Sequence, residues 1–312
     1  MANWWKGRRI LVTGGTGFLG SHLVGSLKAL GAELYLCVRK QADTFPMDPL
    51  RADFCLLPGD LCDFHWVKEA VREARPEVVF HLAAAGVNPG AAAPHTVVET
   101  NVMATLNLLE AVRDRDLARF VYVGSGFEYG GGVKLREDQA LAPTGVYAAS
   151  KAAGGLLCQA YHRAHGLPAV MLRPFTPYGP GERRDRLIPH VILCALQSRD
   201  IPMTGGEQER DFVYVDDVIQ GLLLAVSVPG AVGATINLCS GVGTPIRQAV
   251  EQILSLMDHP VRPLLGAIPY RPGEMWKLSG DPTRAREILG WSPRVGLDTG
   301  LRRAIHWFRD HA

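Results

Sequence analysis

The sequence predicts an α/β protein: a doubly wound parallel sheet with a smaller C-terminal domain. Two observations indicate this fold class. Short apolar runs rich in β-branched residues alternate with amphipathic stretches through the first half of the chain, and this alternation with short connections is typical of βαβ units. The first run also leads into a glycine-rich loop, "TGGTGFLG", which is typical of the Rossmann type of this sheet.

The elements follow from these runs in chain order. Strands are expected where the apolar runs lie, at residues 8–14, 33–39, 53–60, 77–84, 119–125 and 169–175. Helices are expected at 18–31, 63–74, 94–114 and around 147–161, where apolar residues recur at helical spacing. The first helix closes with a glycine, which is a common helix end.

The pattern changes after the sixth strand. Prolines at 174, 177, 180, 189 and 202 interrupt the alternation, because proline removes a backbone donor and breaks regular elements. We therefore expect residues 1–173, with a return at about 211–240, to form the Rossmann domain. Residues of about 174–210 and 241–312 form the second domain in this prediction.

Composition excludes several classes of protein. The 312 residues are 47% hydrophobic and 21% charged, with a net charge of +2, so no strong field points toward nucleic acid or membrane. No apolar run approaches the length of a membrane span. The six cysteines form no Cys/His cluster, so no metal site is expected, and their scatter through apolar segments predicts reduced thiols in a cytoplasmic protein.

The loop after the first strand predicts a dinucleotide site. Gly14, Gly17 and Gly20 have the spacing GxxGxxG, and glycines there allow a tight turn and let backbone N–H groups approach a pyrophosphate at the helix N-terminus. The alternative is a purely structural glycine turn. After the third strand, Asp60 is placed to accept from an adenine amino group, while Asp63 suits a helix N-cap.

The end of the second strand bears on the choice of cofactor. An acid there would bind a ribose 2′-hydroxyl and indicate NAD, but the sequence reads Val38, Arg39 and Lys40. A cation at this place suits a 2′-phosphate, so NADP(H) is favoured and NAD(H) stays possible. A solvated basic strand end is the alternative interpretation.

A tyrosine and a lysine four residues apart suggest carbonyl chemistry. Tyr147 and Lys151 in "YAASK" share one face of a helix. A phenol with a pKa near ~10 is a poor base at neutral pH, and a nearby ammonium favours the phenolate. Ser125, at the end of a strand in "VGSG", could hold a substrate oxygen against Tyr147.

These motifs, in this order and spacing, resemble the extended short-chain dehydrogenase/reductase family of nucleotide-sugar epimerases, dehydratases and reductases. The resemblance also includes "HLAA", "ETNVMATLNLLEAV", "RPFTPYGPGE", "QERDFVYVDDV", "PYRPGE" and "DPTRAREILGW". It implies that Ser125, Tyr147 and Lys151 are catalytic, that Lys151 binds the nicotinamide ribose and that Asn101 lies behind the site. The predicted cofactor-binding residues are Gly14, Thr16, Gly17, Phe18, Leu19, Arg39, Asp60, Leu61, Leu82, Ala83, Ala84, Asn101, Tyr147, Lys151 and Pro174.

The two residues after Ser125 restrict the reaction. Sugar 4,6-dehydratases of this family carry an Asp-Glu pair there, and the decarboxylases that make UDP-xylose keep the glutamate; this chain has Gly126 and Phe127. Neither side chain can act as acid or base, which leaves 4-keto reduction or 4-epimerisation. Glu128 lies one residue further, and on a strand it would point to the other face, so a structural role is expected.

The resemblance also assigns a nucleotide-sugar site to the second domain. Arg210 and Arg271 would hold the diphosphate, since arginine forks suit phosphate oxygens; a surface ion pair is the alternative for each. In many members of the family an asparagine stands at the position of Thr176 and contacts the sugar diphosphate. Thr176 offers a hydroxyl but no amide, so the resemblance does not carry this contact over unchanged. The predicted substrate-binding residues are Ser125, Gly126, Phe127, Thr176, Leu187, Arg210 and Arg271, while Arg173 and His190 are expected to be structural.

The predicted activity is an NADP(H)-dependent 4-ketoreductase acting on a nucleotide-diphosphate 4-keto-6-deoxyhexose. A 4-epimerase that keeps NAD bound is the alternative, and a cofactor-binding sensor without turnover is an alternative of another class. Wide apolar faces on 105–112 and 147–161, with the resemblance, imply a homodimer formed by a four-helix bundle; packing on the sheet alone is the other explanation.

Overall fold

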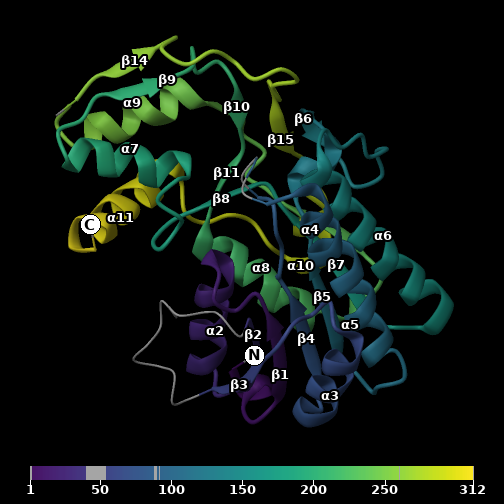
Figure 1. Cartoon of the computed structure of the whole chain (residues 1–312). Coiled ribbons are helices and arrows are strands. Elements are labelled where there is room, and N and C mark those ends of the chain that lie inside the picture. Colours follow the sequence, from purple (N-terminus) through teal and green to yellow (C-terminus); the bar gives the residue numbers. More distant parts are fainter. Residues whose placement is uncertain (1, 40–53, 88–89, 91, 260, 312) are drawn as a thin grey trace.

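A parallel sheet of seven strands forms the larger part of the molecule in the computed structural model, which describes residues 2–39, 54–87, 90, 92–259 and 261–311 (Figure 1). The strand order is β12-β7-β5-β4-β1-β2-β3, and every neighbouring pair is parallel. The strands are β1 (Arg9–Thr13), β2 (Glu33–Val38), β3 (Cys55–Pro58), β4 (Val78–His81), β5 (Arg119–Val123), β7 (Ala169–Pro174) and β12 (Thr235–Leu238). The predicted doubly wound α/β sheet is confirmed, and β12 is a seventh strand that the sequence did not reveal.

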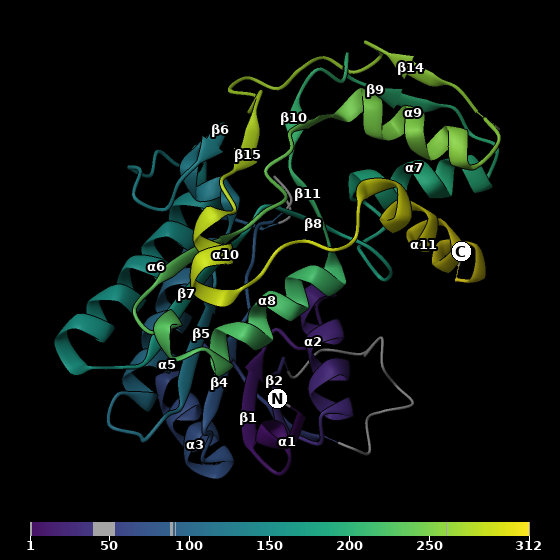
Figure 2. The ribbon, with the colours of Figure 1, turned by 180° about the vertical axis from the view of Figure 1, so that it is seen from behind.

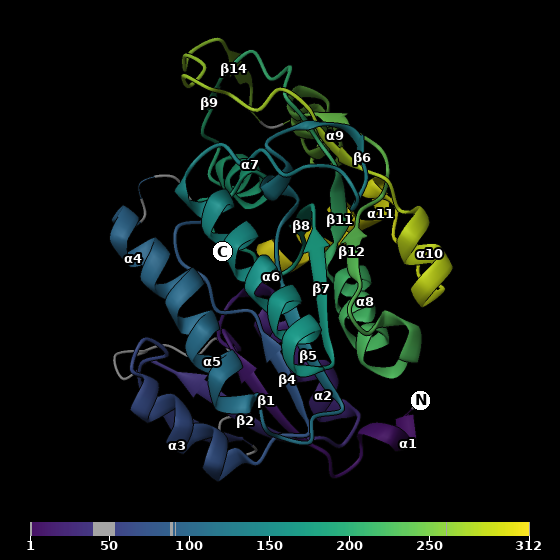
Figure 3. The ribbon, with the colours of Figure 1, turned by 90° about the vertical axis from the view of Figure 1, so that its right-hand side faces the viewer.

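Helices cover both faces of the sheet, as its strands require. Side chains of a strand alternate between the two faces: Ile10 and Val12 join the core beneath α2 (Phe18–Ala29) and α8 (Val215–Ser227), whereas Leu11 joins the core of the other face. That second face is covered by α3 (Phe64–Ala74), α5 (Ala104–Val112) and α6 (Val146–His165), which Figure 3 shows side by side. Burial on both faces explains the continuous apolar runs of the strands.

A second group of elements lies beyond the carboxyl ends of the strands. It contains α7 (Leu187–Leu196), α9 (Ile246–Leu256) and α11 (Leu297–Asp310), which pack on one another (Figure 1). Four short strand pairs complete the fold: β8 (Thr176–Tyr178) with β11 (Phe212–Tyr214), β9 (Ile201–Met203) with β14 (Pro263–Leu265), β10 (Glu209–Arg210) with β13 (Thr244–Pro245), and β6 (Gly132–Leu135) with β15 (Leu278–Gly280).

The chain crosses between the two parts several times. Residues 215–238 return to the sheet as α8 and β12, within the range expected for that return. Helix α10 (Thr283–Leu289) also packs on β12 and α8, although it falls in the range assigned to the second domain (Figure 2). We propose the predicted domain boundaries with this one helix moved to the sheet.

Two predicted elements differ in detail. The helix expected at 94–114 consists of α4 (Pro94–Val98), a π-helical turn η2 (Glu99–Met103) and α5. The strand expected at 119–125 ends at Val123, and a 3₁₀ turn η3 (Gly126–Tyr129) follows. The remaining short helices are α1 (Ala2–Trp5) and η4 (Pro229–Ala231).

The cysteines are all unpaired, as predicted, but Cys62 is exposed and Cys55 is half-buried, so they are not all core residues. Among the described residues, no helix has the length and apolarity to cross a membrane. The same described part of the chain holds no cluster of metal-ligating side chains.

Candidate active site

The glycine-rich loop has the geometry of a close approach to a ligand. Gly14 has φ of +71°, and a Cβ there would lie 2.6 Å from the backbone nitrogen of Ala83. A Cβ at Gly20 would lie 2.0 Å from the carbonyl oxygen of Gly14. Gly17 precedes α2 without any side-chain cap, so N–H groups of the first turn, at Phe18 and Leu19, have no capping side chain. This arrangement fits the pyrophosphate of a dinucleotide.

The other predicted cofactor residues lie at the same carboxyl edge of the sheet, where ligands bind in open α/β sheets. Arg39 is exposed directly after β2, Asp60 and Leu61 follow β3, and Leu82–Ala84 follow β4. Thr16 is half-buried in the glycine loop and Pro174 is the buried last residue of β7. Lys40 lies outside the described residues.

The two aspartates after β3 have separate roles. Asp63 caps α3 by accepting from the backbone nitrogen of Trp66 at 3.1 Å, so its N-cap prediction is confirmed. Asp60 is exposed, and its Oδ1 accepts from the backbone nitrogen of Cys62 at 2.9 Å. The expected contact of Asp60 with an adenine amino group stays a prediction.

Ser125 and Tyr147 meet at the carboxyl end of β5. Ser125 begins η3 and its Oγ accepts from the backbone nitrogen of Phe127 at 3.2 Å. A hydrogen bond with the Ser125 side chain also lowers the pKa of Tyr147, but burial has the larger effect and raises this pKa to about 12. The phenol is therefore protonated and can donate a proton at neutral pH.

Lys151 lies one turn of α6 beyond Tyr147 and is buried. Its Nζ is 4.4 Å from the centroid of the Tyr122 ring, and burial lowers its pKa to about 8. The charges that shift the pKa of Tyr147 come from Glu128 and Arg186. The expected lowering of the tyrosine pKa by the lysine is therefore not the dominant effect in this structure.

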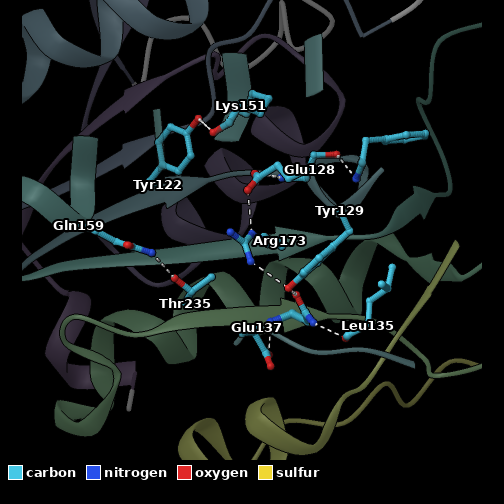
Figure 4. A network of polar contacts seen from close by, with 12 residues as sticks. Tyr122, Glu128, Tyr129, Leu135, Glu137, Lys151, Gln159, Arg173 and Thr235 are labelled. Carbon is cyan, nitrogen blue, oxygen red and sulfur yellow. Dashed lines mark hydrogen bonds and ion pairs between the residues drawn. The ribbon is translucent and has the colours of Figure 1, made fainter. Parts of the chain in front are cut away.

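Glu128 belongs to a buried polar network beneath the site (Figure 4). Its Oε1 accepts from the backbone nitrogen of Ser125 at 2.8 Å, and its Oε2 accepts from Nε of Arg173 at 2.8 Å. Arg173 also donates to the hydroxyl of Tyr129, which donates to Asn237. Glu128 and Arg173 are thus structural, as expected, although Glu128 lies in a 3₁₀ turn and not on a strand.

Asn101 connects two parts of the site through its side-chain amide. Its Oδ1 accepts from the backbone nitrogen of Ala85 at 2.8 Å, and its Nδ2 donates to the Ala85 carbonyl and to Oγ of Ser150. Ser150 in turn donates to the carbonyl of Tyr147 at 2.8 Å. The residue therefore lies behind the site, as expected, and the π-helical turn η2 places it there.

A second chain of hydrogen bonds fixes the strand ends. Thr13 bonds Nδ1 of His81 at 2.7 Å and accepts from the backbone nitrogen of Ala83, and Nε2 of His81 bonds Thr105 at 2.9 Å. Burial lowers the pKa of His81 to about 3, so the ring is neutral. The sequence analysis did not single out this residue, although it stands in "HLAA".

A cavity of about 960 Å³ opens between the two parts of the chain. Of the predicted site residues, the cavity lining includes Phe127, Tyr147, Thr176, Leu187, Arg210 and Arg271. Glu182, Asp185, Arg186 and Glu274 also line it, and sequence reasoning assigned none of them a role. A signal was present in "GPGERRDRL", where two acids and three arginines follow the proline-rich segment.

The two predicted phosphate ligands differ in how they are held. Arg210 donates to the carbonyls of Glu209 and Met275 and to Oε1 of Glu274. Arg271 is an exposed residue of the cavity lining, and its side chain has no hydrogen-bond or ion-pair partner among the described residues. Thr176 has a buried hydroxyl without a hydrogen-bond partner in the same part of the chain.

Comparisons with known proteins show the family of this chain. The sequence profile of the NAD dependent epimerase/dehydratase family matches residues 10–239. The chain is 33% identical to dTDP-glucose 4,6-dehydratase of Streptomyces niveus, with 97% of this chain and 93% of that protein covered. It is similar to the structure of UDP-glucose 4-epimerase from Thermotoga maritima with UDP-glucose, at a TM-score of 0.88 and 28% identity over 97% of this chain and 99% of that one.

UDP-glucuronic acid 4-epimerase from Bacillus cereus, solved with UDP-glucuronic acid and NAD, is a further neighbour. Its TM-score is 0.85 at 26% identity, over 97% of this chain and 99% of that one.

Proposed function

Because this chain belongs to the NAD dependent epimerase/dehydratase family, we propose that it is an NADP(H)-dependent 4-ketoreductase of a nucleotide-diphosphate 4-keto-6-deoxyhexose. The observation that carries the proposal is the cavity between the two parts of the chain. Tyr147, Arg210 and Arg271 all line this cavity. A ketone at the phenol and a diphosphate at the arginines match these groups in chemistry.

Each catalytic side chain has a defined task. A bound nicotinamide dinucleotide supplies the hydride, and the glycine loop with the N-terminus of α2 fits its pyrophosphate. Tyr147 donates its proton to the oxygen at C4 of the sugar. Ser125 hydrogen-bonds the same oxygen and keeps it close to the phenol. Lys151 places a positive charge beside the nicotinamide ribose, because a pKa of about 8 keeps its amino group protonated near neutral pH.

Elimination of water is not part of the proposal, although a similar protein is named as a dehydratase. A Cβ at Gly126 would lie 2.8 Å from the ring of Phe175, so an aspartate there would need the ring to move. Phe127 lines the cavity and has no acidic or basic group. No side chain at these two positions can exchange a proton at C5 or C6 of the sugar.

A 4-epimerase with tightly held NAD is the second candidate, favoured by the solved neighbours that are 4-epimerases. Purified protein separates the two. A reductase oxidises NADPH in proportion to the keto sugar supplied, whereas an epimerase interconverts two sugars without net cofactor use. Interconversion by protein with bound NAD would replace the first proposal by the second, and cofactor binding without any turnover would support a sensor.

Arg39→Asp tests the cofactor preference. The exposed guanidinium at the end of β2 lies where the adenosine ribose is expected, and it can fork onto a 2′-phosphate. The substitution should move the preference toward NAD by about 1.5–3 kcal/mol, which is roughly ten- to a hundredfold. Titration of both cofactors into wild type and variant measures this without a substrate. Equal affinity of wild type for NAD and NADP would contradict the preference for NADP and favour the 4-epimerase over the ketoreductase.

Arg271→Ala tests the diphosphate site. The side chain of this arginine has no hydrogen-bond or ion-pair partner among the described residues, so its removal should weaken ligand binding and leave the fold intact. Loss of a charge-assisted contact should raise KM for the nucleotide sugar by an amount equivalent to about 1.5–3 kcal/mol, with little change in kcat. Arg302→Ala, at an exposed ion pair on α11, is the control. An unchanged KM would place Arg271 outside the substrate site.

We also propose a cytoplasmic homodimer. Val98, Met103 and Leu156 are exposed apolar side chains on α4, η2 and α6, and helices paired across a two-fold axis would cover them. Size-exclusion chromatography with light scattering measures the assembly directly.

A further inference from the structure

Glu182 is a carboxyl group of the cavity without a task in the proposed reaction. It lines the cavity, yet the residue is only 8% exposed. Its Oε1 lies 3.6 Å from Nε of Arg186, and its Oε2 has no hydrogen-bond partner among the described residues. A buried carboxyl oxygen without a partner is costly, so its presence requires an explanation.

Arg186, the neighbour of Glu182, also lines the cavity. Its charge lowers the pKa of Tyr147 and also that of Arg210. Arg186, Tyr147 and Arg210 line the same cavity, so the charge of this guanidinium acts on both of the other groups. A neighbouring carboxylate that offsets the positive charge of Arg186 therefore changes the electrostatic potential of the whole substrate site.

We propose that Glu182 is a positioning residue of the substrate site, which holds Arg186 in the cavity and sets how strongly that guanidinium attracts the diphosphate of a nucleotide sugar. This inference rests on the proposed function for the class of ligand. Glu182 acts through Arg186 and does not contact the reacting atoms.

The protonation of Glu182 gives this effect a direction. Burial raises the pKa of Glu182 to about 8, Arg186 lowers it and Asp185 raises it. Below that pH the carboxyl group is neutral and Arg186 keeps its full attraction for an anion. Above it, the carboxylate offsets the guanidinium, so affinity for the diphosphate should fall as pH rises through about 8.

Other charged groups face the same cavity and have to be separated from Glu182. They are Tyr147 on α6, Arg210 on β10, and Arg271 and Glu274 in the loop before β15. His22 on α2 bonds the carbonyl of Pro180, two residues before Glu182. Lys151 has a pKa of about 8, so it also titrates in this range.

The test compares binding by wild type and Glu182→Gln, since glutamine keeps an acceptor for Arg186 and loses the charge. Calorimetry with UDP-glucose and with dTDP-glucose from pH 6.5 to 9.5 is suitable, because a sugar diphosphate lacks the proton that titrates near pH ~6 in a phosphate monoester. The affinity of the variant relative to wild type should rise about three- to tenfold over this range. Lys151 titrates in both proteins, so its contribution cancels in this ratio.

Two further variants complete the design. Glu137→Gln changes a half-buried glutamate whose pKa is also raised by burial but which lies outside the cavity, and the affinity of this variant relative to wild type should not change with pH. Arg186→Gln removes the guanidinium that Glu182 offsets. This variant should lose the fall in nucleotide-sugar affinity that the ionisation of Glu182 causes in wild type, which keeps the proposal testable if Glu182→Gln does not fold.

The outcomes separate this inference from the proposed function. If wild type binds a nucleotide sugar but the Glu182→Gln ratio is constant with pH, Glu182 does not set the charge of the site and the inference is wrong. If wild type binds neither probe at any pH, the proposed class of substrate is wrong and the inference falls with it.

Discussion

Replacement of Tyr147 by phenylalanine is expected to lower turnover by about 10²–10⁴-fold while cofactor affinity changes by no more than a few-fold. The ring and its packing against the cavity remain, and only the proton donor is lost. Burial raises the pKa of this phenol to about 12, and the bond to Ser125 counteracts only part of that rise. The group is thus an acid at neutral pH. Tyr178 also lines the cavity, but its hydroxyl donates to the carbonyl of Leu297.

Single-turnover kinetics with NADPH and a keto sugar measure this loss. Tyr161→Phe is the matched control, because Tyr161 lies on the same helix and bonds Glu110 away from the cavity. Its rate should stay within about twofold of wild type. More than about a tenth of the wild-type rate in Tyr147→Phe would remove this residue from the acid role.

Arg173→Met is expected to cost about 3–5 kcal/mol of the free energy of unfolding. The side chains of Arg173 and Glu128 are only 8% and 2% exposed and are joined at 2.8 Å. Removal of the arginine leaves a buried carboxylate without its partner and also breaks the bond to Tyr129. Glu128 also accepts a hydrogen bond from the backbone nitrogen of Ser125. Loss of Arg173 frees Glu128 to move, which disturbs the position of Ser125, so catalysis should weaken as well.

Urea unfolding of the variant, with Arg302→Met as a control at an exposed ion pair, tests this expectation. The control should change stability by no more than about 0.5 kcal/mol. The double variant Glu128→Gln with Arg173→Met should recover much of the loss, because no charge is then left unpaired. A loss below about 1 kcal/mol in the single variant would mean that the pair contributes little to the fold.

Features that depend on residues close together in the chain could be predicted from the sequence. The glycine spacing determined where the nucleotide loop lies, because positive φ and close backbone contacts exclude a Cβ. Helical periodicity determined that Tyr147 and Lys151 share one face of α6. The alternation of apolar runs determined the parallel sheet, because each buried strand must be covered on both faces.

Contacts between distant residues were decided only in the tertiary structure. The strand β12 is too short to stand out, and it exists because it pairs with β7 more than sixty residues earlier. Asn101 interrupts a helix that periodicity alone predicts as continuous, since its amide bonds Ala85 and Ser150. Glu128 has a partner only because β7 brings Arg173 to it.

The cavity shows the same division. The sequence by itself determined that Gly126 and Phe127 follow Ser125, and therefore that no acid can act there. Only the fold decided that the segment after β8 lines the same cavity as α6, which brings Glu182 and Arg186 together with Tyr147. The physical reason is that the burial and charge of a side chain depend on which distant segments surround it, and no local pattern records them.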